Sequence, residues 1–241
     1  DATRIGLRYP VEVGLAGDRR RTLQELLPLV DGHEDRGFLK KAQGGMNEWW
    51  QLMEERGTRA DKPMKPQVVA WELGKRLTDT AIVSSDSGTI ATWFARQMKA
   101  RRGQMYSLSG MLATMANGLP YTIAAQVAYP DRQCVAFVAD GGFTMLMGEF
   151  ATAVKYQLPI KVVVIKNNTL GQIKWEQLVF LGNPEYGCEL HPIDFDATRI
   201  GLRYPVEVGL AGDRRRTLQE LLPLVDGHED RGFLKKAQGG M

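Results

Sequence analysis

Two short apolar runs, residues 134–138 and 160–165, constrain the fold of this 241-residue chain more than any other feature. Both runs are rich in β-branched residues, as expected of parallel strands that are covered on both faces. Between the runs, apolar residues recur at spacings of three and four, which predicts one helix with a single apolar stripe. The stripe consists of Phe143, Leu146, Met147, Phe150, Ala151 and Val154. Pro159 marks the end of this helix, and the whole segment predicts a βαβ unit.

Each predicted strand ends in residues that are suited to bind a metal ion and a phosphate group. A right-handed crossover places the carboxyl ends of both strands at one edge of the sheet, so we expect Asp140 and Asn167 to be neighbours. Their side-chain oxygens, with a backbone carbonyl of the Asn-Asn-Thr turn, are the kind of ligand that Mg²⁺ prefers. Gly141 and Gly142 allow a close approach of the backbone where a helix N-terminus offers N–H groups to an anion. These residues predict a site for a metal-bridged diphosphate.

The stretch from Ala139-Asp140-Gly141-Gly142 to Asn167-Asn168-Thr169 resembles the thiamine diphosphate (ThDP) binding motif, a Gly-Asp-Gly followed by Asn-Asn or Asn-Cys. The surrounding sequence is most similar to bacterial pyruvate oxidases and quinone-linked pyruvate dehydrogenases, with acetolactate synthases next. The resemblance implies that Asp140, Asn167 and the backbone carbonyl of Thr169 hold Mg²⁺, and that Gly141 and Gly142 contact the diphosphate. An ordinary strand-turn-helix with a capping Asp is the alternative.

Ala139 stands where the family has its first glycine. Alanine accepts an extended backbone but disfavours a positive φ, so we expect strain of about 1 kcal/mol in this turn.

The resemblance adds cofactor contacts from two earlier segments. Residues 81–83 read as a short strand, and the loop after it is rich in small hydrogen-bond donors. In the family the corresponding loop contacts the diphosphate, which implies contacts from Ser87, Gly88 and Thr89; the alternative is a capping turn alone. Met115, in an expected helical segment, occupies the position of the bulky apolar residue that bends ThDP into a V. The alternative for Met115 is an ordinary core methionine.

A helix is expected to begin soon after the Asn pair and to carry Gln172 and Glu176. The resemblance implies that both side chains face the reacting carbon of the cofactor and the substrate. A helix facing solvent would carry the same residue types.

The expected fold class is α/β, with a mainly parallel sheet, helices on both faces and the ligand at the carboxyl ends of the strands (a ThDP-binding fold). We expect residues 1–46 to be the tail of a central domain and residues 47–65 a helix end and linker. Residues 66–195 should form the ThDP- and Mg²⁺-binding domain, in which Pro66 suits the first turn of a helix. We expect this domain to be incomplete at its C-terminal end, because a copy of residues 1–46 follows it.

Residues 196–241 repeat residues 1–46 without a difference. Structural repeats drift in sequence and have periods of about 20 to 50 residues, so this repeat is not a solenoid. Its natural, engineered or assembly origin is left open. The copies place a strand-helix segment at both chain ends, and in the first copy the strand is predicted at residues 9–15.

A helix should follow this strand, with Asp18 as its N-cap and Pro28 as the residue that ends or kinks it. A second helical stripe runs from Phe38 to Met53. Gly44 and Gly45 interrupt this second stripe at a cost of about 1 kcal/mol each relative to Ala, so we expect it to need tertiary support.

Composition, charge and cysteine content argue against several classes of protein. A hydrophobic content of 44% and a charged content of 24% are those of a soluble globular protein. The net charge is +3, and the basic clusters at residues 19–21 and 96–102 lack interleaved aromatics, which argues against a nucleic-acid partner. The apolar runs are shorter than the ~20 residues of a transmembrane helix. Cys134 and Cys188 allow no disulfide framework or zinc site and favour a cytoplasmic location.

The resemblance implies that the chain is the ThDP- and Mg²⁺-binding part of a pyruvate oxidoreductase, an enzyme that decarboxylates a 2-keto acid through its cofactor. FAD and homo-oligomeric assembly belong to the full-length family member, and a quinone-linked member would make peripheral membrane contact. The chain shows no counterpart of the pyrimidine domain with its activating glutamate, so we expect it to be inactive alone. The alternatives are a fragment of an acetolactate synthase or a benzoylformate-decarboxylase-like enzyme, and a noncatalytic cofactor-binding or assembly module.

Overall fold

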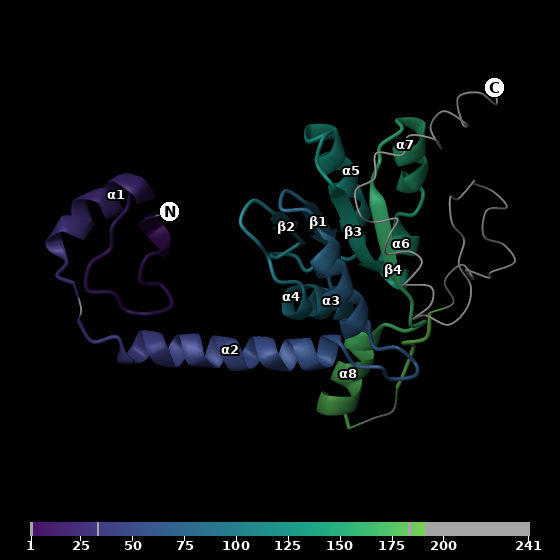
Figure 1. Cartoon of the computed structure of the whole chain (residues 1–241), viewed down its shortest axis with the longest axis horizontal. Coiled ribbons are helices and arrows are strands. Elements are labelled where there is room, and N and C mark those ends of the chain that lie inside the picture. The colour runs from purple at the N-terminus through teal and green to yellow at the C-terminus, as the bar shows by residue number, and fades with distance from the viewer. Residues whose placement is uncertain (1, 33, 183–184, 191–241) are drawn as a thin grey trace, which may run out of the picture. The chain divides into compact units, whose positions relative to one another are not determined.

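The computed structural model describes residues 2–32, 34–182 and 185–190 (Figure 1). The chain divides into two compact units, with the boundary between Trp49 and Trp50. The second copy of the repeat, residues 196–241, lies outside the described residues. None of the described helices is long and apolar enough to cross a membrane.

The first unit contains helix α1 (Arg19–Leu26) between two short 3-10 turns, η1 (Ala2–Arg4) and η2 (Leu27–Leu29). Asp18 caps α1, because its side chain accepts a hydrogen bond of 2.9 Å from the backbone N–H of Arg21. Pro28 lies in η2, directly after the α-helix ends. The sequence predictions for the N-cap and for the end of this helix are confirmed.

The prediction of a strand at residues 9–15 is wrong. This stretch has no strand structure, and its alternating apolar side chains, Tyr9, Val11, Val13 and Leu15, are all exposed. A strand is stabilised by hydrogen bonds to a neighbouring strand, and the described residues provide none here. The apolar alternation therefore has no sheet to join.

Helix α2 (Gly37–Gly57) runs without a break through Gly44 and Gly45, and its last turns belong to the second unit. Met53 is fully buried, and its sulfur lies 3.1 Å from the side-chain amide of Gln97. Gly57 packs against Trp71, since a Cβ at residue 57 would lie 2.4 Å from the indole ring. These contacts supply the tertiary support for the end of α2.

The second unit is built on a four-stranded parallel sheet with the order β2-β1-β3-β4. The strands are β1 (Ile82–Ser85), β2 (Met105–Ser107), β3 (Cys134–Ala139) and β4 (Lys161–Ile165). Their register pairs Ser85 with Phe137 and Ala139 with Ile165, so the carboxyl ends of β1, β3 and β4 lie close together. The predicted parallel pairing of the strands at 134–138 and 160–165 is confirmed.

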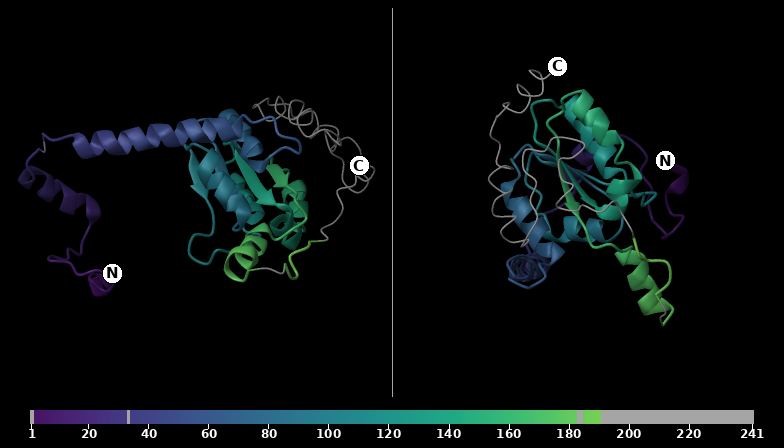
Figure 2. Two further views of the ribbon diagram at one scale, coloured as in Figure 1. Left: turned by 90° about the horizontal axis from the view of Figure 1, so that it is seen from below. Right: turned by 90° about the vertical axis from the view of Figure 1, so that its right-hand side faces the viewer.

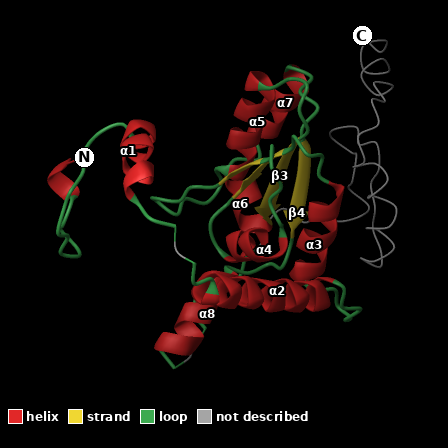
Figure 3. Cartoon of the chain, turned by 60° about the vertical axis from the view of Figure 1, so that its left-hand side comes forward, coloured by secondary structure: helices red, strands yellow, loops and turns green. Residues whose placement is uncertain are grey.

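Helices cover both faces of this sheet, which confirms the predicted α/β fold class (Figures 2 and 3). Helices α3 (Pro66–Arg76) and α4 (Thr89–Gln97) pack on one face through a cluster that includes Leu73, Phe94 and Phe137. Helix α5 (Gly118–Ala128) packs on the opposite face, where it contacts β1, β3 and α7 (Glu149–Lys155). The right-hand view of Figure 2 shows α3 on one side of the strands and α5 on the other.

The single helix predicted between β3 and β4 is wrong, because the structure has two helices there. They are α6 (Asp140–Met145) and α7 (Glu149–Lys155), and Leu146 between them has a non-helical backbone. Leu146 and Met147 remain about two-fifths exposed, so burial does not hold the middle of the stripe in a helix. Gly148 has a low helix propensity, and the helix breaks where neither packing nor propensity supports it.

The buried end of α2 provides a test of this packing. Met53→Ala removes a fully buried side chain and leaves the Gln97 amide without its sulfur partner. We expect the free energy of unfolding to fall by about 2–5 kcal/mol, measured by urea denaturation. Met111→Ala is the matched control, because Met111 is 97% exposed and its loss should change stability by less than about 0.5 kcal/mol. Equal effects of both substitutions would contradict this account of the packing.

Candidate functional site

The candidate site lies where the strand order changes direction. Strands β1 and β3 are neighbours in the sheet, but the chain leaves β1 toward α4 on one face and leaves β3 toward α6, which contacts α5 on the other face. The two connections therefore diverge at the carboxyl ends of the strands, which is where open parallel sheets usually bind ligands. The polar residues that follow β1, β3 and β4 meet at this edge of the sheet.

Asp140 joins the end of β3 to the turn after β4. One carboxylate oxygen of Asp140 accepts a hydrogen bond from the N–H of Gly141 at 2.9 Å. The other accepts hydrogen bonds from the N–H groups of Asn167 at 3.0 Å and Asn168 at 2.7 Å. The side chain is 1% exposed, so these charge-assisted bonds replace the water that a buried carboxylate loses. The structure thus brings the predicted pair Asp140 and Asn167 together.

Ala139 adopts φ −90° and ψ 165°, which is an ordinary extended backbone. The strain that we expected at this position is therefore absent, because the turn does not require a positive φ here.

The proposed metal ligands are oxygen atoms that can still accept a further partner. The side-chain oxygen of Asn167 accepts a bond of 3.2 Å from the N–H of Thr169, and the carbonyl of Thr169 accepts one of 2.9 Å from Gly171. A carboxylate, amide or carbonyl oxygen has two lone pairs, so each of these oxygens can accept a further partner. One carboxylate with two neutral oxygens fits Mg²⁺, which completes its shell with water and phosphate. The described residues contain no cluster of three His, Cys, Asp or Glu side chains that would suit another metal site.

Gly142 and Gly118 make room for a carboxylate that our sequence analysis did not select, that of Asp86. The N–H of Gly118 donates a hydrogen bond of 2.6 Å to Asp86. A Cβ at residue 142 would lie 2.0 Å from the other carboxylate oxygen of Asp86, and a Cβ at residue 118 would lie 2.5 Å from Val138. Gly142 is therefore required by the contact with Asp86, whatever it contributes to ligand binding.

Asp86 is as deeply buried as Asp140, but one of its two carboxylate oxygens has no hydrogen-bond partner within the described structure. Burial raises the pKa of Asp86, and the hydrogen bond from Gly118 opposes that rise. The sequence does contain a signal for this residue, since Asp86 follows β1 directly, as Asp140 follows β3.

Gly141 lies among three apolar side chains. A Cβ at this position would lie 3.0 Å from Leu190, 3.3 Å from Met115 and 3.8 Å from Leu170. Met115 belongs to the loop before α5 and not to a helix, which corrects the sequence expectation for its segment. Leu170 and Leu190 are further residues that the sequence analysis missed.

The loop after β1 approaches the turn after β4. Gly88 is the N-cap of α4 with φ +101°, a conformation that favours glycine, and the N–H of Ser87 lies 3.4 Å from the carbonyl of Thr114. Thr89 lies against Gly171, since a Cβ at residue 171 would be 3.2 Å from its methyl group. Ser87, Gly88 and Thr89 therefore lie on the edge of the sheet that carries Asp140.

Helix α8 (Gly171–Phe180) carries Gln172 and Glu176 with both side chains exposed to solvent. Its apolar residues are exposed as well, including Trp175 and Phe180. The described structure therefore leaves the predicted substrate-facing residues in contact with water.

A short segment after α8 folds back over the Asn-Asn-Thr turn. The N–H of Leu190 donates to the carbonyl of Asn168 at 2.9 Å, and the N–H of Leu170 donates to the carbonyl of Cys188 at 2.8 Å. The hydroxyl of Thr169 also donates to the Cys188 carbonyl, at 3.1 Å. Cys188 and Cys134 are both buried, free thiols. This segment therefore holds the Asn-Asn-Thr turn through hydrogen bonds that are separate from those to Asp140.

Comparison with known proteins places this site in a family. Residues 86–227, more than half of the chain, match the family described as "Thiamine pyrophosphate enzyme, C-terminal TPP binding domain". The Bacillus subtilis protein YdaP, provisionally named as containing thiamine pyrophosphate, is 40% identical over 92% of this chain and 38% of its own length.

Two further relatives carry the names of enzymes. Pyruvate oxidase of Lactiplantibacillus plantarum is 30% identical over 84% of this chain and 34% of its own length. Acetolactate synthase isozyme 3 large subunit of Escherichia coli is 28% identical over 76% of this chain and 32% of its own length. The chain spans about a third of the length of these relatives.

The contact between Gly142 and Asp86 leads to a stability prediction. Gly142→Ala forces a methyl group against the Asp86 carboxylate, so we expect a loss of about 1–3 kcal/mol in the free energy of unfolding. Gly148→Ala is the control, because a Cβ at residue 148 meets nothing within 4 Å. Combining Gly142→Ala with Asp86→Ala should cost less than the sum of the single changes. Additive costs in urea denaturation would show that the two residues do not compete for this space.

The raised pKa of Asp86 predicts a pH dependence. The folded state holds the Asp86 proton more tightly than the unfolded state, so ionisation of Asp86 destabilises the fold as pH rises above its ordinary value of 3.8. Asp86→Asn keeps an oxygen acceptor for Gly118 and cannot ionise. The stability of this variant relative to the wild type should therefore increase from about pH 4 toward neutrality. A difference that stays constant across this pH series would exclude the burial effect.

Proposed function

Because the chain belongs to the thiamine pyrophosphate (ThDP) enzyme family and carries its C-terminal cofactor-binding domain, we propose that it binds ThDP and Mg²⁺ as part of a pyruvate-decarboxylating oxidoreductase. The observation that carries this proposal is the hydrogen bonding of Asp140 to the turn at Asn167 and Asn168. These bonds hold the Asp140 carboxylate beside the turn that carries the side-chain oxygen of Asn167 and the carbonyl of Thr169, which supports the proposed ligand set.

Three chain segments would hold the cofactor. Asp140, Asn167 and the carbonyl of Thr169 would bind Mg²⁺, and the backbone of Gly141 and Gly142 at the start of α6 would face the diphosphate. Ser87, Gly88 and Thr89 would add donors from the loop after β1.

Apolar side chains would form the remaining wall of the cofactor site. Met115 lies beside Gly141 with Leu170 and Leu190, and this group would support the cofactor rings and exclude water. Gln172 and Glu176, at the start of α8, would contact the substrate.

When bound, ThDP supplies the carbanion chemistry by which a 2-keto acid loses CO₂. Pyruvate as the substrate is supported by the 30% identity to a pyruvate oxidase and by the sequence resemblance around the motif. FAD, homo-oligomeric assembly and a quinone acceptor are proposed for the full-length enzyme only, since the chain spans about a third of its relatives. Relatives named acetolactate synthase share the same segment, and they support ThDP binding equally.

The proposal is tested by calorimetric titration of the chain with ThDP, with and without Mg²⁺. We expect saturable binding that requires the metal. Asn167→Ala removes one ligand and should raise the Kd for ThDP by about tenfold or more. Asp140→Asn should do the same, because an amide lacks the charge and cannot accept at both atoms.

Asp131→Ala is the control for this experiment, because Asp131 lies exposed in the turn before β3. Thermal unfolding of each variant, measured without ThDP and Mg²⁺, distinguishes the loss of a metal-binding side chain from the loss of the folded structure. Folded Asn167 and Asp140 variants with unchanged affinity would refute the metal assignment. Absence of any ThDP binding by the wild-type chain in the presence of Mg²⁺ would instead support a noncatalytic module.

A further inference from the structure

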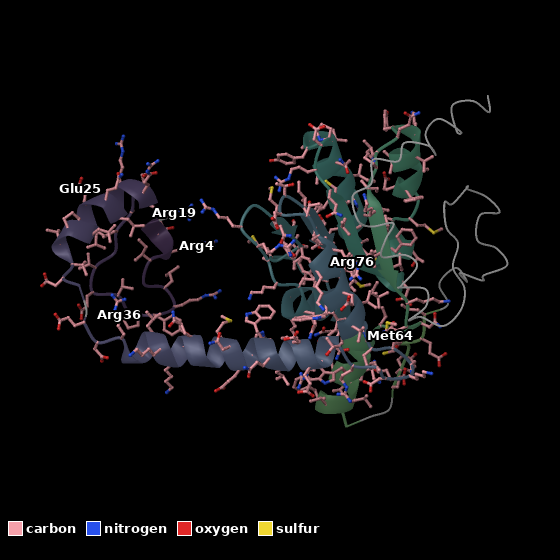
Figure 4. All side chains as sticks on the ribbon, viewed as in Figure 1. Arg4, Arg19, Glu25, Arg36, Met64 and Arg76 are labelled. Carbon is pink, nitrogen blue, oxygen red and sulfur yellow. The ribbon has the colours of Figure 1, made fainter. Side chains whose placement is uncertain are left out.

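The junction of α2 and α3 contains a cavity that is separate from the residues of the cofactor site. Its volume is about 270 Å³, and its lining residues are Arg56, Arg59, Asp61, Lys65 and Gln67. All five lie in the second unit, between the last turn of α2 and the first turn of α3. Met64, labelled in Figure 4, marks the loop between the two helices.

The charges around this cavity are not balanced. Arg59 forms an ion pair of 3.0 Å with Asp61, the only carboxylate in the lining. In the described part of the chain, the side chains of Arg56 and Lys65 have neither an ion pair nor a hydrogen bond. By contrast, Arg76 at the C-terminal end of α3, labelled in Figure 4, forms an ion pair of 2.7 Å with Glu72. The lining therefore carries three cationic side chains against one carboxylate.

Polar groups at the start of α3 also lack partners. The side-chain oxygen of Gln67 is buried and accepts no hydrogen bond within the described structure. An amide can be rotated so that its NH₂ group takes the place of the oxygen, and the NH₂ group then donates to an anion. Gln67 is the second residue of an 11-residue helix, where the helix dipole favours a negative charge. The N–H of the next residue, Val68, is already bonded to the carbonyl of Lys65 at 3.1 Å.

We propose that this cavity binds a phosphate group, either free or as part of a small phosphorylated molecule. Arg56 and Arg59 supply planar forks of donors that match phosphate oxygens, and Lys65 supplies a further charge from the loop. Gln67 supplies a neutral donor at the start of α3. A doubly charged anion matches the excess of two cations, and a single carboxylate does not.

The experiment is a titration of the chain with inorganic phosphate at low ionic strength, without Mg²⁺ or ThDP, followed by calorimetry. We expect saturable binding of one phosphate per chain. Arg56→Ala and Lys65→Ala should each raise the Kd by about tenfold, since each removes a charged donor. Gln67→Glu keeps the shape of the side chain, adds a negative charge and should also abolish binding.

Lys62→Ala is the matched control, because Lys62 lies in the same loop and its loss changes the net charge equally without altering the lining. Asn167→Ala should leave phosphate binding unchanged, which separates this cavity from the proposed cofactor site. Comparison of phosphate with a sugar phosphate distinguishes a free ion from a phosphorylated molecule. Absence of saturable binding, or equal losses in Lys62→Ala and Arg56→Ala, would overturn the proposal even if ThDP binds as expected.

Discussion

The hydrogen bonding of Asp140 is the interaction on which the rest of the site depends. Its carboxylate receives N–H groups from Gly141 at the start of α6 and from Asn167 and Asn168 after β4. These bonds cross-link two neighbouring strand ends at a point where the main-chain ladder has stopped. A neutral side chain of the same size could not satisfy three donors at once, because an amide has only one acceptor atom. The turn thus needs both oxygen atoms of the Asp140 carboxylate.

A second carboxylate, Asp86, performs a similar task on the other side of β3. It receives the N–H of Gly118 and packs against Gly142, so it links the loop after β1 to the starts of α5 and α6. Glycine at residues 118 and 142 allows this approach because no Cβ occupies the space. The two buried carboxylates together fix the loops at this edge of the sheet, one through three hydrogen bonds and the other through one hydrogen bond and close packing.

The two proposed ligand sites use different physical means. At the cofactor site, oxygen atoms converge at the end of a buried sheet, which suits a divalent cation and its attached phosphates. At the junction of α2 and α3, cationic side chains and a helix N-terminus converge without an equal number of carboxylates. Such an arrangement attracts an anion directly, with no need for a metal ion.

The sequence by itself determined the βαβ unit, the neighbourhood of Asp140 and Asn167, the cap at Asp18 and the helix start at Pro66. Each of these follows from local periodicity or from the topology of parallel strands, and a short stretch of sequence is enough to recognise either one. Only the tertiary structure decided the break at Leu146, the absence of a strand at residues 9–15, and the roles of Asp86 and Leu190. These features depend on whether a side chain finds a partner distant in sequence. An apolar pattern shows that a residue can be buried, but burial itself requires another element to cover it.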